Sequence, residues 1–456
     1  MKIKYKNIAV FGIGVTGKSS ISALSSLGAN VYVIDESSRD EIENALKDID
    51  NIEYEIIDDY EKFNWSKIDL LLKSPGIKLD NKIIKFVSEK SVEIVSDIEL
   101  AYRIYGGENF IAITGTNGKT TTTSLVAHIL QSSGVKAKVV GNIGVGILQE
   151  IIDNGLDTIY VVETSSFQLA STKTFAPKIA AITNITPDHI DWHGSYENYI
   201  YEKKRLGYNL PETSSLVLNY DDEELMHFNV GLKCKVVYFS VKDKLDNGYY
   251  FDEDYICFGD NKIFSRKLIN LVGMHNVSNT ICAFAMCKLF GLKDNQIVEG
   301  IKTFSAIEHR IEPVKKIKDV WYYNDSKGTN VDSTEKAIAG FDSNIILIAG
   351  GYDKNAEYDR LFMEPWKIKS MILLGQTKFK IKDTASKYGI KSIEITDNLE
   401  EATNKAYSIS SSGDVVLFSP ACASWGMYKN YEERGRHFKE IVNNIYEKDK
   451  KETSTI

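Results

Sequence analysis

The sequence lacks the features that mark membrane-spanning, disulfide-bonded and nucleic-acid-binding proteins. No apolar run approaches the roughly 20 residues that a membrane-spanning helix needs. The five cysteines are scattered and include no C-x-x-C pair, which argues against a zinc site or a disulfide framework and suits a reducing cytoplasm. A net charge of −8 leaves no basic excess to bind nucleic-acid phosphates or a membrane surface. These absences predict a cytoplasmic protein that holds any anionic ligand locally.

The N-terminus could be mistaken for a secretory signal, because basic MKIKYK precedes apolar IAVFGIGV. A Gly-rich loop and Lys18 interrupt that apolar run, so a buried first strand is the better interpretation.

A length of 456 residues suggests about three domains. Short apolar runs alternate with longer amphipathic stretches from end to end, which predicts an α/β protein with parallel sheets covered by helices. The expected domains are 1–98, 99–308 and 309–456. A helix is expected over 18–27. The stretch 213–308 mixes turn-like DNGYYFDED with short strand-like pieces, and residues 446–456 have the composition of a solvated tail. The expected strands are 7–11, 30–34, 69–72, 110–114, 158–163, 180–185, 319–323, 344–349, 370–374 and 414–418.

The clearest chemical motif is ITGTNGKTTTT at residues 113–123, where a strand runs into a Gly-rich turn and a helix. Backbone N–H groups of Gly115 to Lys119 would surround a triphosphate at the helix N-terminus. Lys119 would contact the β- and γ-phosphates, and the Thr120 hydroxyl would bind Mg²⁺. An ordinary strand-turn-helix junction is the alternative.

A second stretch, FGIGVTGKSS at residues 11–20, matches two phosphate-binding patterns at once. Gly12, Gly14 and Gly17 fit the G-x-G-x-x-G of a dinucleotide fold, and Asp35 at the end of the next strand would by itself suggest NAD. Lys18 and Ser19 complete a P-loop pattern, but the later strand end DLLLKSPG offers Lys73 where a Mg²⁺-binding acid is needed. The P-loop match is therefore interpreted as accidental.

Eight motifs in order resemble the Mur ligases of peptidoglycan synthesis. They are GTNGKTT, GNIG (141–144), ETSSFQL (163–169), TPDHIDWHG (186–194), GMHNVSN (273–279), EHR (308–310), DSKGTN (325–330) and SPACAS (419–424). The resemblance implies a Rossmann-like N-terminal domain, a central P-loop ATPase-like domain with a parallel sheet and a Rossmann-like C-terminal domain. ETSSFQL and SPACAS resemble the branch that adds D-glutamate to UDP-N-acetylmuramoyl-L-alanine.

The resemblance implies an amide-bond-forming ligase of cytoplasmic peptidoglycan precursor synthesis. ATP would phosphorylate the substrate carboxylate to an acyl phosphate, and the amine of D-glutamate would displace phosphate through a tetrahedral intermediate. Cations must sit between the repelling carboxylate and γ-phosphate, so one or two Mg²⁺ ions are expected. The resemblance also implies a monomer.

Three further residues are candidates for catalysis and metal binding beside Lys119 and Thr120. Glu163 closes a strand beside the phosphate loop and suits a Mg²⁺ ligand, although it could be a solvated acid. His189 resembles the second metal ligand of the family. Lys203 has the setting of a lysine on an exposed helix, but the resemblance implies a carbamylated lysine that binds Mg²⁺. Its spacing from the preceding motif favours Lys203 over Lys204.

The resemblance assigns the remaining binding residues to three ligands. Those for ATP are Gly115, Thr116, Asn117, Gly118, Lys119, Thr120, Thr121, Asn276, Arg310 and Asp325. Those for the UDP-substrate are Gly14, Val15, Thr16, Gly17, Asp35, Ser74, Gly76, Asn142 and His189. Those for D-glutamate are Lys327, Thr329, Lys354, Ser424 and Tyr431, where relatives carry Phe at the position of Tyr431.

Other functions remain open from the sequence alone. A folylpolyglutamate synthetase would not use the N-terminal Rossmann-like domain, and sister Mur ligases add other amino acids. An NAD-dependent oxidoreductase would leave GTNGKTT unused, and a nucleotide-dependent switch would hydrolyse ATP without forming an amide.

Overall fold

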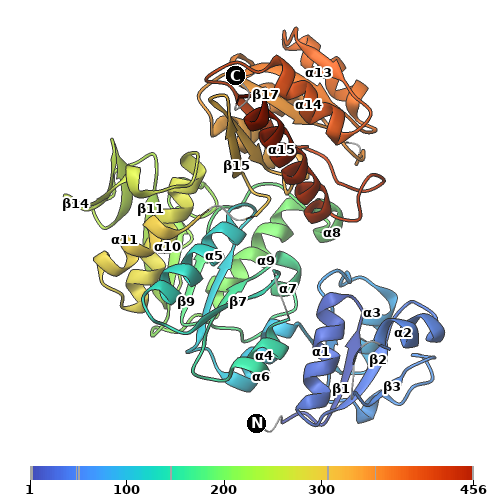
Figure 1. The fold of residues 1–456 in the computed structure, drawn as a ribbon. Coiled ribbons are helices and arrows are strands. Elements are labelled where there is room, and N and C mark those ends of the chain that lie inside the picture. Colours follow the sequence, from blue (N-terminus) through green and yellow to red (C-terminus); the bar gives the residue numbers. More distant parts are fainter. Residues whose placement is uncertain are drawn as a thin grey trace. The chain divides into compact units, whose positions relative to one another are not determined.

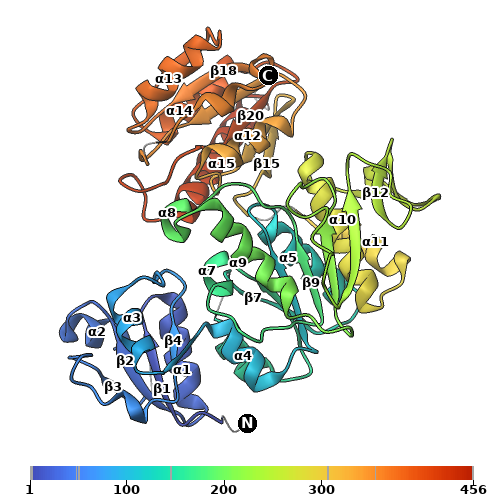
Figure 2. The same cartoon turned by 180° about the vertical axis from the view of Figure 1, so that it is seen from behind.

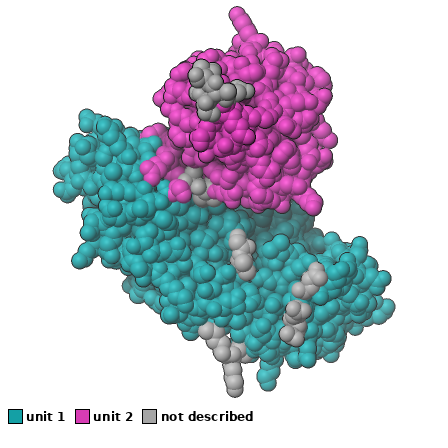
Figure 3. Space-filling model, viewed as in Figure 1, with its two compact units in different colours: residues 1–269, 277–304 teal, residues 270–276, 305–456 magenta. Residues whose placement is uncertain are grey.

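The computed structural model describes residues 4–47, 49, 52–143, 146–305, 308–354 and 356–453, which form three sheets with helices against them (Figures 1 and 2). The predicted α/β class with three such domains is confirmed. The chain divides into two compact units, of which unit 1 is Met1–Ile269 with Val277–Phe304 and unit 2 is Asn270–Asn276 with Ser305–Ile456 (Figure 3). Unit 1 contains the first two sheets, so the domain boundaries drawn from the sequence stay predictions.

The first sheet is parallel throughout and has the strand order β3-β2-β1-β4-β5. Successive strand residues face opposite sides. Ile8 and Val10 pack in one cluster with α1, while Ala9 and Phe11 pack in another with α3. Its elements are β1 Asn7–Phe11, α1 Val15–Ser26, β2 Asn30–Ile34, α2 Arg39–Leu46, β3 Tyr54–Ile56, β4 Leu70–Lys73, α3 Lys82–Glu89, β5 Glu93–Val95 and α4 Asp97–Tyr105.

The second sheet has nine strands in the order β14-β13-β12-β11-β10-β9-β6-β8-β7. It is parallel from β7 to β12, and β12, β13 and β14 are antiparallel, so the parallel prediction fails at this edge. Its elements are β6 Phe110–Thr114, α5 Lys119–Ser132, β7 Ala137–Gly141, α6 Ile147–Asn154, β8 Ile159–Glu163, α7 Ser166–Leu169, β9 Ile179–Ile182, α8 Ile190–His193, α9 Tyr196–Tyr208, β10 Ser215–Asn219, β11 Lys235–Ser240, β12 Gly248–Asp252, β13 Tyr255–Phe258, β14 Asn261–Ser265, α10 Met274–Phe290 and α11 Asp294–Thr303.

The third sheet has the order β15-β16-β20-β17-β18-β19 and is parallel except for β15. Helices α12 and α13 pack on one face, and α14 and α15 pack on the other. Its elements are β15 Glu312–Ile317, β16 Val320–Asn324, α12 Val331–Ala339, β17 Ile345–Ala349, β18 Ile368–Leu373, α13 Lys378–Lys387, β19 Ile393–Ile395, α14 Leu399–Ile409, β20 Val415–Phe418 and α15 Tyr431–Thr453. Short 3₁₀ helices occur at Trp65–Lys67, Arg266–Leu268, Asp359–Phe362 and Pro365–Lys367.

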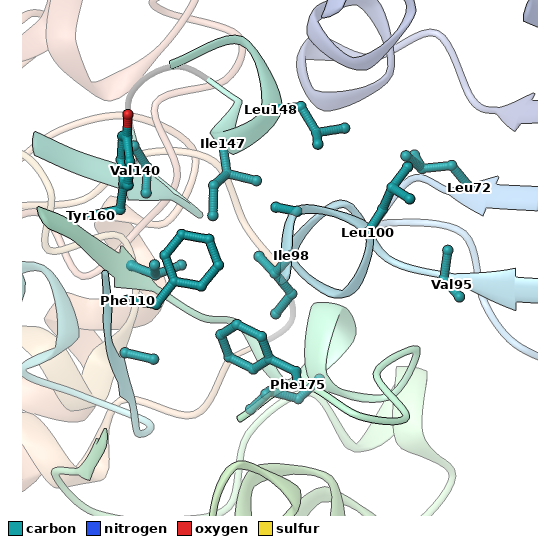
Figure 4. Packing of buried hydrophobic residues seen from close by; sticks show 14 of the residues in the cluster. Leu72, Val95, Ile98, Leu100, Phe110, Val140, Ile147, Leu148, Tyr160 and Phe175 are labelled. Atoms are coloured by element: carbon teal, nitrogen blue, oxygen red, sulfur yellow. The ribbon is translucent and has the colours of Figure 1, made fainter. Parts of the chain in front are cut away.

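A continuous apolar core joins the first two sheets. Helix α4 carries Ile98 and Leu100, which lie between Leu72 on the side of the first sheet and Phe110 and Phe175 on the side of the second (Figure 4). Burial of these side chains in one cluster explains why the two sheets form a single unit.

Helix α15 continues to Thr453, so the predicted tail over 446–456 is helical as far as that residue. Its described side chains over 446–451 are half-buried or exposed, as the prediction of a solvated segment expects. Phe438, Val442 and Ile445 of this helix are buried against the third sheet and outweigh its many charged residues.

All five cysteines are buried with free thiols, which agrees with the absence of a predicted disulfide framework. None of the helices in the described residues combines the length and the apolar character needed to cross a bilayer.

Candidate active site

The predicted phosphate loop lies between β6 and α5, and β6 lies inside the second sheet between β8 and β9. The predicted order of strand, Gly-rich turn and helix is therefore confirmed. Gly118 caps α5 with a φ of 81°, a left-handed conformation that favours glycine. A Cβ atom at Gly118 would lie 2.2 Å from the Oδ1 atom of Asn279, so any larger residue would clash with the Asn279 side chain.

Two backbone amides of the phosphate loop donate hydrogen bonds to Asn184, a residue that the sequence did not single out. The N–H groups of Thr116 and Asn117 donate to the main-chain oxygen and the Oδ1 atom of Asn184, at 2.8 and 2.9 Å. The Nδ2 atom of Asn184 donates back to the Asn117 carbonyl at 3.0 Å. Asn184 follows β9, the strand beside β6, and reaches the loop from there. These two amides are therefore engaged within the protein, and the expectation that the amides of Gly115 to Lys119 surround a triphosphate stays a prediction.

The lysines of the predicted site converge on the same loop. The Nζ atom of Lys119 donates to the carbonyl oxygens of Gly115 and Thr116, both at 2.8 Å. The Nζ atom of Lys203 donates to the Gly115 carbonyl at 2.7 Å. Burial lowers the pKa of Lys203 well below its ordinary value, and the nearby charge of Lys119 lowers it further. The charges of Asp188 and Glu163 act in the opposite direction.

The interpretation of Lys203 as an exposed lysine is wrong, since the residue is 2% exposed. Tyr199, Lys203 and Leu206 share the buried face of α9, at the spacing of successive helical turns. Composition alone does not distinguish this face from the solvated one.

Glu163 ends β8 and is 2% exposed, so the alternative of a solvated acid is wrong. Asn142 donates from Nδ2 to its Oε1 atom at 2.9 Å. His189 caps α8 with its side chain 49% exposed and its ring 4.9 Å from that of Phe167. Within the described residues, His189 forms no hydrogen bond or ion pair with Glu163 or Lys203.

A cavity of about 460 Å³ opens at the carboxyl ends of the first sheet's strands. Ligands of open α/β sheets bind at such an edge. Its lining includes seven of the nine residues predicted for the UDP-substrate, which are Gly14, Val15, Thr16, Asp35, Ser74, Gly76 and Asn142. Ile13, Glu36 and Ile77 also line it and were not singled out from the sequence.

Gly17 and His189 do not line this cavity. Gly17 is buried in α1, where an added Cβ atom would lie 1.8 Å from the Gly12 carbonyl oxygen. The glycine is therefore needed to pack the helix against the preceding turn. Asp35 accepts a hydrogen bond from the Ile13 amide at 3.0 Å, so its carboxylate also holds the Gly-rich loop.

The residues predicted for D-glutamate lie in unit 2, in loops after β16, β17 and β20 and at the start of α15. β20 pairs in parallel with both β16 and β17, so the three loops leave the same edge of the sheet. Tyr352 and Ala423 form a bridge between two of these loops. Lys327 lies over the Tyr431 ring at 5.4 Å, and Lys354 lies over the Trp425 ring at 5.0 Å. Thr329 and Ser424 belong to the first and third loops.

Three residues predicted for ATP, Asn276, Arg310 and Asp325, also lie in unit 2. Asn276 donates from Nδ2 to the Val272 carbonyl at 2.7 Å. Burial raises the pKa of Asp325 to about 6, against the hydrogen bond from Ser419 and the charge of Arg310. Residues 115–121 belong to unit 1, so the assembly of one ATP site from both units stays a prediction.

Three domain families match the chain in succession. They are described as the Mur ligase MurD-like N-terminal domain over residues 6–96, the Mur ligase middle domain over 113–287 and the Mur ligase glutamate ligase domain over 309–422. The chain is 42% identical over 447 residues to a UDP-N-acetylmuramoylalanine--D-glutamate ligase of Caldanaerobacter subterraneus subsp. tengcongensis, covering 97% of this chain and 99% of that protein. An enzyme of the same name from Clostridioides difficile is 41% identical over 453 residues, covering 98% and 100%.

The chain belongs to the Mur ligase family. It is therefore an ATP-dependent ligase that forms an amide bond, as the resemblance of its motifs implies. Among solved structures, a UDP-N-acetylmuramate-alanine ligase from Thermotoga maritima has a TM-score of 0.62 at 19% identity, covering 96% of this chain and 99% of that one. A pseudomurein peptide ligase from Methanothermus fervidus has a TM-score of 0.58 at 19% identity, covering 96% and 100%. These two confirm the fold.

Mur ligases depend on ATP and Mg²⁺ in general. The residues of this chain fit a cation, because the Oε2 atom of buried Glu163 has no hydrogen-bond partner in the described part of the chain. A buried carboxylate oxygen without a partner is costly unless a ligand satisfies it. No group of three or more His, Cys, Asp or Glu side chains forms a metal cluster among the described residues, so ligands of other kinds are needed beside Glu163.

Two residues of this Mur ligase site were missed from the sequence. Asn184 holds the phosphate loop, as described above. His193 is buried and its Nε2 atom lies 2.9 Å from the Ser166 hydroxyl. Burial and the charge of Lys203 lower the pKa of His193 to about 4. Both residues lie inside or beside motifs, but nothing in the motif pattern distinguishes them from their neighbours.

Proposed function

We propose that this chain uses ATP to join the carboxylate of UDP-N-acetylmuramoyl-L-alanine to the amine of D-glutamate. The observation that carries the proposal is the charged group around the Gly-rich loop. Lys119 and Lys203 both contact the Gly115 carbonyl, and the charge of Glu163 acts on the pKa of Lys203. The Oε2 atom of Glu163 has no hydrogen-bond partner in the described part of the chain. Such a group can bring a phosphate and a carboxylate together, which is the difficult part of acyl-phosphate formation.

In this proposal, residues 115–121 bind the ATP phosphates, with Lys119 turning from its own loop toward the β- and γ-phosphates. Asn276, Arg310 and Asp325 of unit 2 would hold the nucleotide. The γ-phosphoryl group passes to the substrate carboxylate, and the bond from phosphorus to the β-phosphate bridging oxygen breaks to release ADP. The neutral amine of D-glutamate then attacks the acyl carbon and gives up a proton to solvent. The bond from the acyl carbon to the phosphate oxygen breaks, and phosphate leaves from the tetrahedral intermediate.

Thr120, Glu163, His189 and the carbamate of Lys203 would hold one or two Mg²⁺ ions. The bound cation would offset the repulsion between the phosphate and carboxylate oxygens. Lys203 suits modification because a carbamate forms from a neutral amine, and burial lowers the pKa of this amine. His189 is exposed and contacts neither acid nor lysine of the site, so its role requires movement or ligand binding.

The cavity of the first sheet is proposed to hold the UDP part of the substrate. Asp35 and Ser74 follow β2 and β4, the two strands that flank β1, and line the cavity together with the Gly-rich turn. The amides of this turn lie at the start of α1, where an anionic diphosphate is favoured. Asn142, which contacts Glu163, lies both on this cavity and beside the proposed metal site. It connects the nucleotide end of the substrate to the reacting end.

D-Glutamate carries two carboxylates, and the loops of unit 2 offer Lys327, Lys354, Thr329 and Ser424 as cationic and hydroxyl donors. Tyr431 would form part of this site through its ring. The protein is further proposed to act as a cytoplasmic monomer in peptidoglycan precursor synthesis, without binding nucleic acid or membrane.

Phosphate release from ATP tests the proposal when each substrate is supplied alone and then together. Release should require both UDP-N-acetylmuramoyl-L-alanine and D-glutamate, and the amide product should appear in the same amount. Turnover with L-alanine or a diamino acid in place of D-glutamate would indicate a sister ligase. Release without an amino acid would indicate a nucleotide-dependent switch, and saturable NADH fluorescence would support an oxidoreductase.

A further inference from the structure

Arg434 is a buried cation that is not among the residues proposed to bind ATP, Mg²⁺, the UDP-substrate or D-glutamate. It sits in the first turns of α15 and is 4% exposed. In the described part of the chain its guanidinium forms no ion pair with a carboxylate. The charge of Asp325 favours the charged form of Arg434 without a direct ion pair. Because burial of a charge is expensive, the hydrogen bonds that the guanidinium donates must offset much of its cost.

The guanidinium donates three hydrogen bonds to two different loops. Its Nε and Nη2 atoms donate to the hydroxyl and carbonyl oxygens of Ser326, at 3.0 and 2.7 Å. Its Nη1 atom donates to the Cys422 carbonyl at 3.1 Å. Ser326 belongs to the loop after β16, and Cys422 belongs to the loop after β20. The rigid planar fork of an arginine suits such a connection, whereas a lysine has a single nitrogen.

The first turn of α15 is hydrogen-bonded to the same two loops. The Ser326 hydroxyl donates to the Tyr431 carbonyl at 2.8 Å, which ties the first turn of α15 to the loop after β16. The loop after β17 also passes close by, because a Cβ atom added at Gly351 would lie 3.5 Å from Nη1. The three tied segments carry Lys327, Thr329, Ser424 and Tyr431, which are the residues proposed to bind D-glutamate.

We propose that Arg434 is a positioning residue that fixes the loops of the amino-acid site relative to one another. This inference rests on the proposed function for the identity of the amino acid. Arg434 acts through the Ser326 and Cys422 carbonyls and is not placed in contact with substrate. Its removal should therefore loosen the arrangement of donors around D-glutamate and weaken binding of that substrate.

The same contacts predict that loss of Arg434 leaves the binding of ATP and of the UDP-substrate unchanged. Asp325 is proposed to hold ATP and is fixed by other contacts, since its amide donates to the Phe418 carbonyl at 2.7 Å and Ser419 donates to its Oδ2 atom at 2.6 Å. The cavity for the UDP-substrate lies in unit 1. Loss of Arg434 should thus be selective for the amino acid.

The test measures the KM values for all three substrates in Arg434→Met, which keeps most of the side-chain volume. The KM for D-glutamate should rise by about tenfold or more, because hydrogen bonds to a charged group are lost, while those for ATP and the UDP-substrate stay within about twofold. Arg436→Met is the matched control, because Arg436 lies on the same helix and is exposed. It should leave all three values unchanged. An unchanged KM for D-glutamate in folded Arg434→Met, or an equal rise in all three values, would overturn the proposal.

Two further variants cover the case in which Arg434→Met does not fold. Arg434→Lys keeps the charge but cannot span both loops, and Ser326→Ala removes two hydroxyl hydrogen bonds while leaving the carbonyl in place. Both should raise the KM for D-glutamate selectively and by less than Arg434→Met. No change in that value for either variant would count against the positioning role.

Amide hydrogen exchange separates this proposal from the proposed function, because it needs no substrate. Peptides covering 325–330 and 419–424 should exchange faster in Arg434→Lys than in the unchanged protein and in Arg436→Met. If the unchanged protein does not turn over D-glutamate but the exchange difference is present, the proposed function fails and the positioning of the loops stands. If turnover is normal and exchange is unaltered, the positioning role fails alone.

Discussion

The Nζ atom of Lys203 lies 2.7 Å from the carbonyl oxygen of Gly115, the first residue of the Gly-rich loop. An amine that donates to a carbonyl holds the loop in place, whereas a carbamate in the same position would present oxygen atoms to it. Carbamylation would therefore exchange a contact within the loop for a ligand to a cation.

Replacement of Lys203 tests that exchange. Lys203→Ala should lower turnover by about 10²–10³-fold, because it removes a charged ligand from the reacting groups. Acetate or formate should restore part of the activity, since a small carboxylate can replace a carbamate but not an ammonium. Lys204→Ala is the control, because the Lys204 ammonium pairs with Glu224 at 3.3 Å and should not be needed. Absence of rescue in a folded Lys203→Ala protein would argue against the carbamate.

The two Gly-rich stretches should respond differently to loss of their lysines. Lys119→Ala should lower ATP turnover by about 10²–10³-fold, because Lys119 is the cation expected to gather the phosphates. Lys18→Ala, in the loop of the first sheet, should retain near-normal ATP turnover. The measurement is steady-state phosphate release at saturating substrates. The reverse result would place the triphosphate in the N-terminal domain.

Glu163→Gln should separate activity from stability. The buried Oε2 atom of Glu163 has no hydrogen-bond partner among the described residues, which costs free energy in the folded protein. A neutral amide should therefore leave the free energy of unfolding in urea unchanged or raise it. Turnover should fall sharply, and the Mg²⁺ concentration for half-maximal activity should rise. Glu150→Gln on α6, whose Oε2 atom accepts from Asn154 at 2.8 Å, should keep its turnover. A strongly destabilised Glu163→Gln protein with normal Mg²⁺ dependence would indicate a structural glutamate.

The pH dependence of the free energy of unfolding should reveal the raised pKa of Asp325. Its pKa is raised from 3.8 to about 6, so between these values the folded protein keeps a proton that the unfolded chain has lost. The contribution of Asp325 to stability therefore falls as the pH rises from about 4 to about 6, by up to about 3 kcal/mol. Asp325→Asn should remove this loss. Urea denaturation at several pH values should show the variant gaining stability relative to the unchanged protein across that window, and a constant difference would refute the raised pKa.

Much of the fold was predictable because buried parallel strands appear in sequence as short apolar runs. The runs at 7–11 and 30–34 coincide with β1 and β2 to the residue. Helix α1 begins at Val15, three residues before the expected start, since its first turn is the Gly-rich stretch itself. The antiparallel strands β12, β13 and β14 were not predicted one by one, because turn-like DNGYYFDED interrupts the short strand-like pieces of this stretch.

The candidate site was predictable where a motif dictates backbone shape, as at Gly118 and along the first-sheet cavity. Contacts made by side chains from distant segments were not, because a single sequence carries no record of which residues meet. One example is Asn184, which accepts hydrogen bonds from two amides of the phosphate loop. Another is Arg434, which donates hydrogen bonds to two loops of unit 2. The burial of Lys203 was likewise invisible, since a lysine on a helix is ordinarily solvated.

The burial of all five thiols has a practical consequence. Burial raises the pKa of the Cys234, Cys257 and Cys422 thiols, so little thiolate is present to react with maleimides at neutral pH. The five native cysteines should therefore react little with a fluorescent maleimide, so most of the label would attach to cysteines that are introduced on the surface. A pair of cysteines introduced on exposed positions, one on each unit, could report the distance between donor and acceptor dyes as each ligand is added.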